Sequence, residues 1–289
     1  MMKKETKNNK IAVNEKDFSW YVNEAEKGNA AAQFTVGKYY YEGKNGVKKD
    51  FKKAFYWYKK AADQDYVIAQ VSVGFCYTNG VGTEKNDKKA FCWYKKAAEQ
   101  GYPIAKFMIA HCYDFGIGIE KNKDTALKLY DEIVQQQKRA EDTPEICLIT
   151  AFCYEHGLGV GENQQKAFEL YLKVAEKGEV TSQLEIAKRY DNGTGIEKNK
   201  KEAFNWYIKA SDKNDAKAQY NVGNCYLNGW GVEQDEKEAF DWYMKAAEQG
   251  YAQAQFRISQ CYELGWGTHI DPVASEAWRV QATKNEDKE

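Results

Sequence analysis

A block of about 36 residues recurs along the chain, and this recurrence limits the folds that the chain can adopt. The sequence NDKKAFCWYKKAAEQG at 86–101 has close copies that begin at Asp50, Asn199 and Asp235. Each copy keeps an Ala-Phe pair, a Trp-Tyr pair and small residues near its end. Self-similarity at this period predicts one supersecondary unit per copy, which buries its core only against neighbouring copies.

Each repeat is predicted to contain two α-helices. In the second repeat, Ala69, Val73, Gly74 and Tyr77 fall on one face of a first helix at 67–78. A recurring small residue in mid-helix predicts close approach of the partner helix, at Gly37, Gly74, Ala110, Ala151, Ala187, Gly223 and Ser259. A glycine then ends the first helix, and an Asx side chain caps the second helix. These caps are Asp50, Asn86, Asn122, Asn163, Asn199, Asp235 and Asp271.

The register of the repeats predicts the domain organisation. Residues 14–27 match the second half of a repeat and are expected to cap an array that spans 14–283. Seven full repeats are predicted at 28–64, 65–100, 101–140, 141–177, 178–213, 214–249 and 250–283. Residues 1–13 and 284–289 are predicted to be disordered tails. With the opening half-repeat, the array is expected to contain about fifteen helices.

The third repeat departs from the others. An insertion at 135–143 (QQQKRAEDT) lengthens the interval between helix-ending glycines from 36 to 41 residues. It is expected to form a bend between two sub-stacks, a longer helix or a loop that serves a partner. Loop growth that a solenoid tolerates is the simplest interpretation. Pro144 is predicted to start the next first helix.

Charge and hydropathy exclude several function classes. The net charge of −1 argues against nucleic acid or acidic lipid as the main partner. We find no apolar run of the length that a signal peptide or a membrane span requires, so a cytoplasmic or nuclear location is expected. No C-x-x-C occurs, and five of the seven cysteines share one repeat position. Reduced thiols that pack as small hydrophobic side chains are therefore expected at Cys76, Cys112, Cys153, Cys225 and Cys261.

The repeated pattern A-x-x-x-V-G-x-x-Y-x-x-G-x-G, followed by N-D-x-K-K-A-F-x-W-Y-x-K-A-A, closely resembles the Sel-1-like repeat, a relative of the tetratricopeptide repeat. The resemblance covers about residues 14–283. It implies an all-α, right-handed α/α superhelical solenoid and an adaptor that assembles complexes in signalling, protein quality control or host–bacterium contact. Some bacterial relatives carry cysteines that staple neighbouring helices. Here those positions hold Ala62 and Gln70, and Ala98 and Lys106, so the staple is absent.

Three short motifs that spell functional sites are better explained by the repeat. The D-F-G sequence at 114–116 spells a kinase magnesium motif, but it falls at a helix end and lacks a companion H-R-D. The G-V-G turn at 80–82 follows a predicted helix, whereas a phosphate loop follows a strand. The N-G-T sequon at 192–194 is interpreted as a helix stop.

The three histidines are predicted to be structural or surface residues. His111 and His156 lie in or just after the first helices of successive repeats, and His269 is remote in sequence. They do not form a convincing zinc site or catalytic triad. We therefore expect no catalytic, metal-binding or cofactor-binding residues, no cofactor and no enzymatic activity.

The concave side of the solenoid, lined by first helices, is the predicted binding surface. Positions beside the core face vary in chemistry from repeat to repeat, which is typical of a recognition surface or of unconstrained surface. The candidate groove consists of Phe75, Met108, His111, Phe152, Glu185, Lys188, Asn221, Asn224, Arg257 and Gln260. In it, the apolar residues would anchor a protein or peptide partner and the polar residues would give specificity.

Three hypotheses for the function remain open. The first is a non-enzymatic adaptor or scaffold, as a monomer or with weak self-association, that binds neither nucleic acid nor membrane. The second is a regulatory or targeting subunit of a signalling or quality-control assembly. The third is a hydrolase like those suggested for some cysteine-rich relatives.

Overall fold

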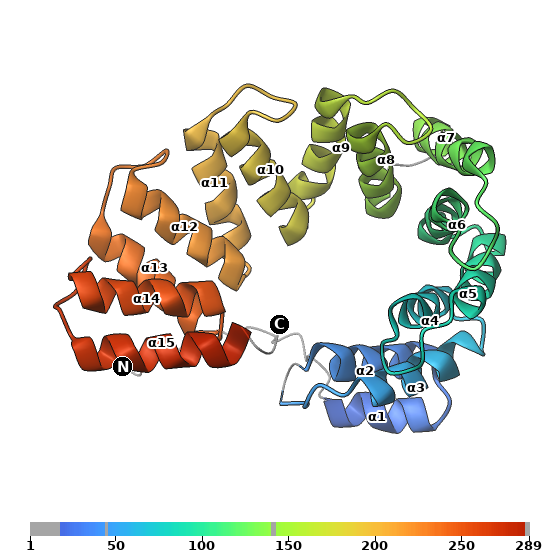
Figure 1. The fold of residues 1–289 in the computed structure, drawn as a ribbon, viewed down its shortest axis with the longest axis horizontal. Helices are drawn as coiled ribbons and strands as arrows, with labels where there is room; N and C mark the ends of the chain where they lie inside the picture. Colours follow the sequence, from blue (N-terminus) through green and yellow to red (C-terminus); the bar gives the residue numbers. More distant parts are fainter. Residues whose placement is uncertain (1–17, 44–45, 140–142, 287–289) are drawn as a thin grey trace, which may run out of the picture. The chain divides into compact units, whose positions relative to one another are not determined.

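The structure, a computed structural model, describes residues 18–43, 46–139 and 143–286. These residues form fifteen α-helices and no β-strand (Figure 1). The all-α fold predicted from the sequence is confirmed. The predicted tail at 1–13 and the first part of the opening half-repeat, 14–17, lie outside the described residues.

After α1 (Phe18–Glu26), first and second helices of the repeats alternate along the chain. The first helices are α2 (Ala30–Glu42), α4 (Val67–Asn79), α6 (Pro103–Phe115), α8 (Pro144–His156), α10 (Val180–Asn192), α12 (Ala216–Asn228) and α14 (Ala252–Leu264). The second helices are α3 (Phe51–Ala62), α5 (Asp87–Glu99), α7 (Lys123–Arg139), α9 (Gln164–Glu176), α11 (Lys200–Ser211), α13 (Glu236–Glu248) and α15 (Pro272–Glu286). The last helix continues past the predicted end of the array at 283, because neither glycine nor proline follows to stop it.

The chain divides into an N-terminal unit, residues 1–129, and a C-terminal unit, residues 130–289. The division falls within α7, which at 17 residues is longer than the other second helices. Much of the insertion at 135–143 is therefore helical, as one of the three sequence-based alternatives proposed. Pro144 occupies the first turn of α8, as predicted.

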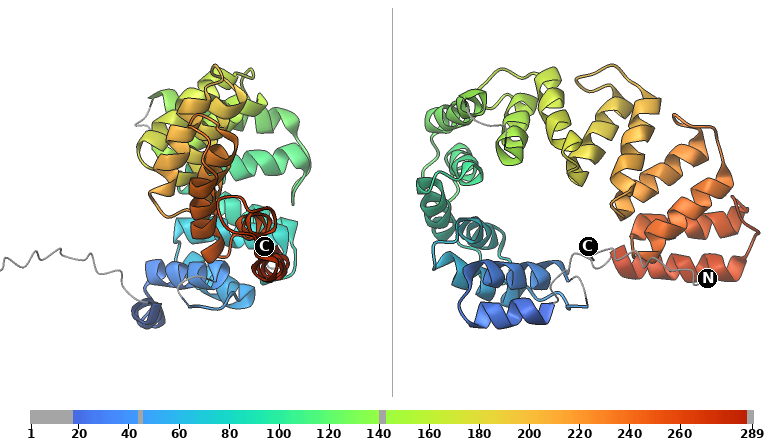
Figure 2. Two further views of the ribbon diagram at one scale, coloured as in Figure 1. Left: turned by 90° about the vertical axis from the view of Figure 1, so that its left-hand side faces the viewer. Right: turned by 180° about the vertical axis from the view of Figure 1, so that it is seen from behind.

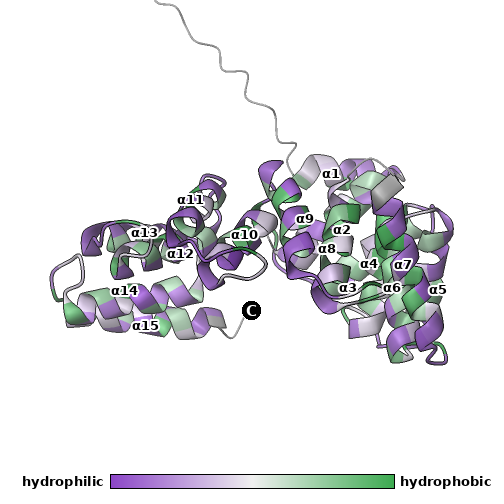
Figure 3. Cartoon of the chain, turned by 90° about the horizontal axis from the view of Figure 1, so that it is seen from above, coloured by the Kyte–Doolittle hydropathy of each residue, from purple (hydrophilic) through white to green (hydrophobic). Residues whose placement is uncertain are grey.

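Within each unit, first helices lie side by side on one face and second helices on the other (Figures 1 and 2). In the C-terminal unit the helix pairs follow a curve, with α8, α10, α12 and α14 on its concave side (Figure 1). The helices carry both hydrophobic and hydrophilic residues, as a two-layer array requires (Figure 3). None of the described helices is both long and apolar enough to cross a bilayer.

The predicted side-chain caps are confirmed in all seven repeats. Each Asp or Asn oxygen accepts a hydrogen bond from a backbone N–H three residues later, at 2.9–3.0 Å. Each first helix ends at a glycine in the left-handed region, with φ between 66° and 78°. Local sequence thus sets the end of each first helix and the start of each second helix.

Two glycines of the second repeat show how closely neighbouring segments approach each other. A Cβ atom on Gly74 would lie 2.4 Å from the ring of Tyr94, which packs across from the second helix of the same repeat. The close approach predicted for the mid-helix small residue is therefore to an aromatic ring. A Cβ on Gly82 would lie 1.9 Å from the carbonyl oxygen of Phe51, in the preceding second helix. The second glycine of the turn thus joins successive repeats.

The five cysteines at the shared repeat position are buried, as is Cys147. Burial raises the pKa of the five shared-position thiols to about 12. These thiols are protonated at neutral pH and pack as hydrophobic groups. Gln70 Nε2 donates a hydrogen bond of 3.4 Å to the Ala62 carbonyl. A buried amide thus links the end of α3 to α4.

Candidate functional site

All ten residues of the predicted groove lie on first helices, six or nine residues after the N-cap. The N-terminal unit holds Phe75, Met108 and His111, and the C-terminal unit holds the other seven. Each unit thus carries its own set of candidate residues.

In the N-terminal unit the three candidates lie on α4 and α6. Phe75 is exposed, and its ring meets Tyr41 edge to face, with the ring centroids 6.5 Å apart. Met108 is half-buried and packs against the core. The His111 ring lies 4.4 Å from the Phe115 ring, and burial lowers the pKa of His111 below its ordinary value. This surface is therefore largely apolar and uncharged at neutral pH.

In the C-terminal unit several polar candidates already have partners within the protein. Asn221 donates to a carbonyl of its own helix at 2.8 Å, and Asn224 Oδ1 accepts from Tyr243 Oη at 2.8 Å. Arg257 Nη1 donates to Gln260 Oε1 at 2.9 Å. A ligand would have to compete with these bonds.

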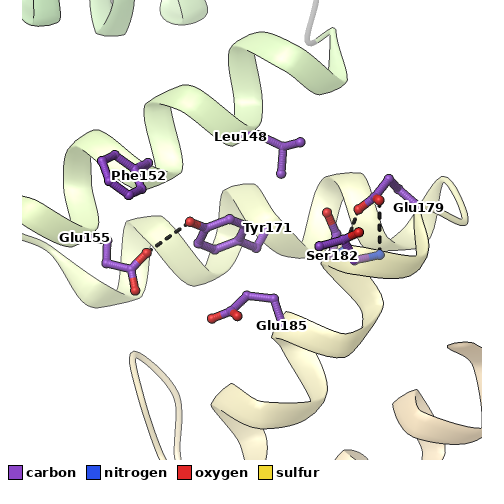
Figure 4. Close-up of a pocket in the computed structure, with 8 residues that line it drawn as sticks. Leu148, Phe152, Glu155, Tyr171, Glu179, Ser182 and Glu185 are labelled. Carbon is purple, nitrogen blue, oxygen red and sulfur yellow. Dashed lines mark hydrogen bonds between the residues drawn. The ribbon is translucent and has the colours of Figure 1, made fainter. Parts of the chain in front are cut away.

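Phe152 and Glu185 are the two predicted residues that line one pocket, of about 480 Å³ (Figure 4). Phe152, 38% exposed, stacks on His156 with the ring centroids 4.0 Å apart. Lys188 is exposed and does not line the pocket. The lining side chains come from α8, α9 and α10 and from the N-cap of α10; they are Leu148, Phe152, Glu155, Tyr171, Glu179, Thr181, Ser182 and Glu185.

Arg189, only 2% exposed, connects the acidic residues beneath the pocket. Its Nη2 lies 2.7 Å from Glu155 Oε1, and its Nε lies 3.0 Å from Glu185 Oε1. Its guanidinium lies 4.7 Å from the ring centroid of Tyr171, whose hydroxyl donates to Glu155 Oε2 at 3.0 Å (Figure 4). Burial, reinforced by Glu155, raises the pKa of Tyr171. The pocket floor is therefore a fixed network of charged and hydrogen-bonded groups.

Arg189 stands at the repeat position that holds a buried cysteine in five of the other six repeats. In four of these repeats the thiol lies near the tyrosine of the preceding second helix, as Cys225 does for Tyr207. A guanidinium is much larger than a thiol, so the ring of Tyr171 cannot pack as deeply. Tyr171 is half-buried, whereas Tyr207 is buried.

Glu179 opens the pocket further, because it stands at the N-cap position that α4, α6 and α14 fill with tyrosine. At α4 this tyrosine, Tyr66, packs on Phe34 at a centroid distance of 5.6 Å. Leu148 occupies the register of Phe34, so neither ring of that contact is present here. Glu179 instead accepts hydrogen bonds from the backbone N–H groups at the start of α10.

Sequence reasoning missed Glu155, Tyr171, Glu179 and Arg189. The available signal was the departure from the repeat at inward positions: arginine for cysteine and glutamate for tyrosine. Tyr171 matches the repeat and carries no such signal.

Among the residues that the structure describes, no group of three His, Cys, Asp or Glu could hold a metal ion.

The pattern of the repeat also identifies the family. The Sel1 repeat matches this sequence seven times, at residues 30–66, 67–102, 103–136, 147–179, 180–215, 216–251 and 252–279. The chain belongs to the Sel1 repeat family. Each match joins one first helix to the second helix that follows it, so this Sel1 repeat protein has seven repeats.

Several solved structures are similar to this chain. A Sel1 repeat protein from Oxalobacter formigenes is 30% identical, with 86% of this chain and 96% of that one covered and a TM-score of 0.57. A protective antigen of uropathogenic Escherichia coli with an SLR fold is also 30% identical, covering 94% and 66%, with a TM-score of 0.40. An immunity protein of Pseudomonas aeruginosa is 20% identical, covering 78% and 86%, with a TM-score of 0.48. Comparison with curated protein sequences found no match.

Proposed function

We propose that this Sel1 repeat protein is a non-enzymatic adaptor or scaffold that binds a protein or peptide partner on its first-helix faces. The pocket between α8, α9 and α10 carries the proposal, because it combines exposed Phe152 with carboxylates that buried Arg189 holds in place. Concave sites with apolar walls and a few fixed polar groups are typical of binding sites. Exposed Phe75 offers a second apolar contact in the N-terminal unit.

A regulatory or targeting subunit would use the same surfaces, and the identity of the partner separates these two roles. A hydrolase would need an activated nucleophile. The raised pKa of the five buried thiols makes them poor nucleophiles at neutral pH, which supports the adaptor. A hydrolytic activity that disappears when His111, His156 and His269 are replaced would favour the enzyme instead.

We further infer a cytoplasmic or nuclear protein that is monomeric or weakly self-associating and binds neither nucleic acid nor membrane. The free cysteines are typical of a reducing compartment. The nearly balanced charge supports a protein partner over a polyanion.

Affinity purification with mass spectrometry tests the proposal. The bait is the full chain, either unchanged or carrying Phe152→Glu, Phe75→Glu or Tyr56→Glu. Tyr56 is an exposed aromatic residue on α3, a second helix, and serves as the matched control. We expect Phe152→Glu to lose partners that Tyr56→Glu retains. If both phenylalanine variants keep every partner of the unchanged chain, the assignment of the binding face is wrong.

A further inference from the structure

We propose that the pocket between α8, α9 and α10 binds a lysine side chain of the partner. The inference rests on the proposed function, because it specifies the chemistry of the partner residue that enters the pocket. Three properties of the pocket support it: uncompensated negative charge, a free acceptor, and apolar walls that suit an aliphatic stem.

The charge of the pocket is negative. The carboxylates of Glu155, Glu179 and Glu185 line it. Among the described residues, Arg189 is the one cation paired with any of them, and it pairs with Glu155 and Glu185. Two negative charges therefore remain uncompensated in a partly enclosed space. Such a site attracts a cation more strongly than the same charges would on an open surface.

The free acceptor in the pocket suits an ammonium group. Both oxygens of Glu155 are occupied, by Arg189 and Tyr171. Glu185 uses Oε1 for Arg189, and its Oε2 accepts no hydrogen bond from any described residue. The Ser182 hydroxyl, in a side chain only 2% exposed, also lacks a partner within the described part of the chain. The free oxygen of Glu185 can accept from an ammonium group, and the unpartnered Ser182 hydroxyl is enclosed beside it in the pocket wall.

Lysine fits this arrangement better than arginine. A guanidinium pairs best with both oxygens of one carboxylate, whereas an ammonium is a compact point charge. Here one oxygen of Glu185 is already held by Arg189, so the two-oxygen arrangement is not available. The acceptor pattern therefore favours lysine.

The pocket walls suit the aliphatic stem of lysine. Leu148 and Phe152 supply apolar surface from α8. Glu185 projects from α10, and Glu155 is bonded to Tyr171 (Figure 4). Long cationic side chains bury their methylene groups against such surface and can also interact with an aromatic face. The protein makes the same kind of contact within itself, since Lys245 Nζ lies 3.7 Å from the ring centroid of Trp242.

The test starts from random dodecapeptides displayed on phage and selected on the intact chain. Selected peptides are synthesised, and affinity is measured by fluorescence polarisation. Each lysine is replaced in turn by norleucine, which removes the ammonium and keeps the stem, and by arginine. We expect one lysine whose replacement by norleucine weakens binding at least tenfold, with arginine intermediate.

Protein variants then connect that lysine to the pocket. Glu185→Gln removes the free carboxylate, and we expect it to abolish most of the difference between the lysine and norleucine peptides. Glu176→Gln, at an exposed position of α9, is the matched control and should leave the difference unchanged. Circular dichroism of both variants checks that the fold is retained.

The outcomes separate this inference from the proposed function. Peptides that depend on Phe152 but bind equally well with norleucine overturn the lysine assignment and leave the adaptor proposal standing. Peptides selected for acidic residues would do the same. Both proposals fail if no peptide binds. They also fail if Phe75→Glu, Phe152→Glu and Glu185→Gln all leave the affinity for the peptides unchanged.

Discussion

A tyrosine in the middle of the second helix packs in a cluster of aromatic rings in some repeats, whereas in the fourth repeat it lines a pocket. In the first repeat Tyr58 packs with Phe34, which also meets Tyr66, at centroid distances of 5.4 and 5.6 Å. In the sixth repeat Tyr220 contacts Tyr243 and Tyr251 in the same way, at 5.8 and 5.5 Å. The corresponding residues of the fourth repeat are Leu148, Tyr171 and Glu179, and there a pocket replaces the cluster of rings.

The difference teaches that one repeat can hold a closed cluster of rings or an open pocket, depending on a few inward-facing residues. Arg189 takes the place of a thiol beneath the ring, and Glu179 takes the place of a ring at the N-cap. Both changes occur at the junction of the fourth and fifth repeats. The fifth repeat is intermediate between the two forms, with Leu184, Tyr207 and Asp215 at the corresponding positions. Its N-cap residue is acidic, but Cys225 lies near the ring and Tyr207 is buried. Arginine beneath the ring therefore distinguishes the open site.

Removal of the tyrosine ring should separate the two sites most clearly. Tyr243 is 0% exposed, so Tyr243→Ala should lower the free energy of unfolding by about 4 kcal/mol. Half-buried Tyr171 should cost about half as much on replacement by alanine, because less apolar surface leaves a packed environment. Urea unfolding followed by circular dichroism measures both. Equal losses would show that Tyr171 is packed like the others and that the pocket is not open.

Replacement of the buried arginine should give the next largest effect. Arg189→Met leaves Glu155 and Glu185 without their cation, and we expect a loss of about 2 kcal/mol in the free energy of unfolding. The loss stays below that of a fully buried pair because both carboxylates keep some contact with water.

Arg279→Met is the matched control for the buried arginine. Arg279 pairs with Glu263 at 2.8 Å on the surface, so its loss should cost less than about 0.5 kcal/mol. Adding Glu155→Gln to Arg189→Met should recover part of the stability, since the repulsion is then reduced. If Arg189→Met and Arg279→Met lower the free energy of unfolding equally, the network beneath the pocket stabilises the protein no more than a surface ion pair does.

The open site can also be converted to the closed form. A triple variant, Leu148→Tyr, Glu179→Tyr and Arg189→Cys, copies the residues of the sixth repeat and its neighbour. We expect about 1 kcal/mol of added stability, because two aromatic contacts replace an open pocket. A crystal structure should show Tyr171 buried and the pocket filled. A triple variant that is less stable than the parent would mean that the backbone of α10 also differs from that of α14.

Much of the fold could be predicted because its determinants are local. Asn86 caps a helix with its own side chain, and Gly80 ends one with its own backbone conformation. The extent of α7 was left open, because glutamine, lysine and arginine around position 137 suit either a helix or a surface loop. Because the same pattern recurs in neighbouring repeats, one ambiguous segment does not change the predicted fold.

The candidate site could be predicted only in part. Register placed Phe152 and Glu185 on one face, and the structure brings them into one pocket. Register could not identify Tyr171, which is identical in type to its buried counterparts, because its exposure depends on Arg189 from the next repeat. The replacement of cysteine by Arg189 is visible in the sequence. Its pairing with Glu155 and Glu185 is seen only in the structure. Interactions between repeats, rather than within one, carried the missing information.

The smallest expected effect concerns the two stacked histidines, one in each unit. His111 stacks on Phe115 in α6, and His156 stacks on Phe152 in α8. Burial lowers the pKa of His111 below 6.5, although the carboxylate of Asp114 opposes the shift. As the pH falls below about 6.5, the unfolded chain therefore binds a proton that the folded chain does not. The free energy of unfolding should fall over this range, by a small amount because His111 keeps contact with water.

His111→Gln should remove this part of the pH dependence, and His269→Gln, at an exposed position, should leave it unchanged. Urea unfolding at pH values of about 7.5 and 5 measures the difference, and NMR titration of the histidine ring gives the direction of the pKa shift directly. If His111 titrates above its ordinary value, then Asp114 outweighs burial. The first-helix face of the N-terminal unit would then carry a positive charge near pH 6, and its contrast with the acidic pocket of the C-terminal unit would be one of charge sign as well as of packing.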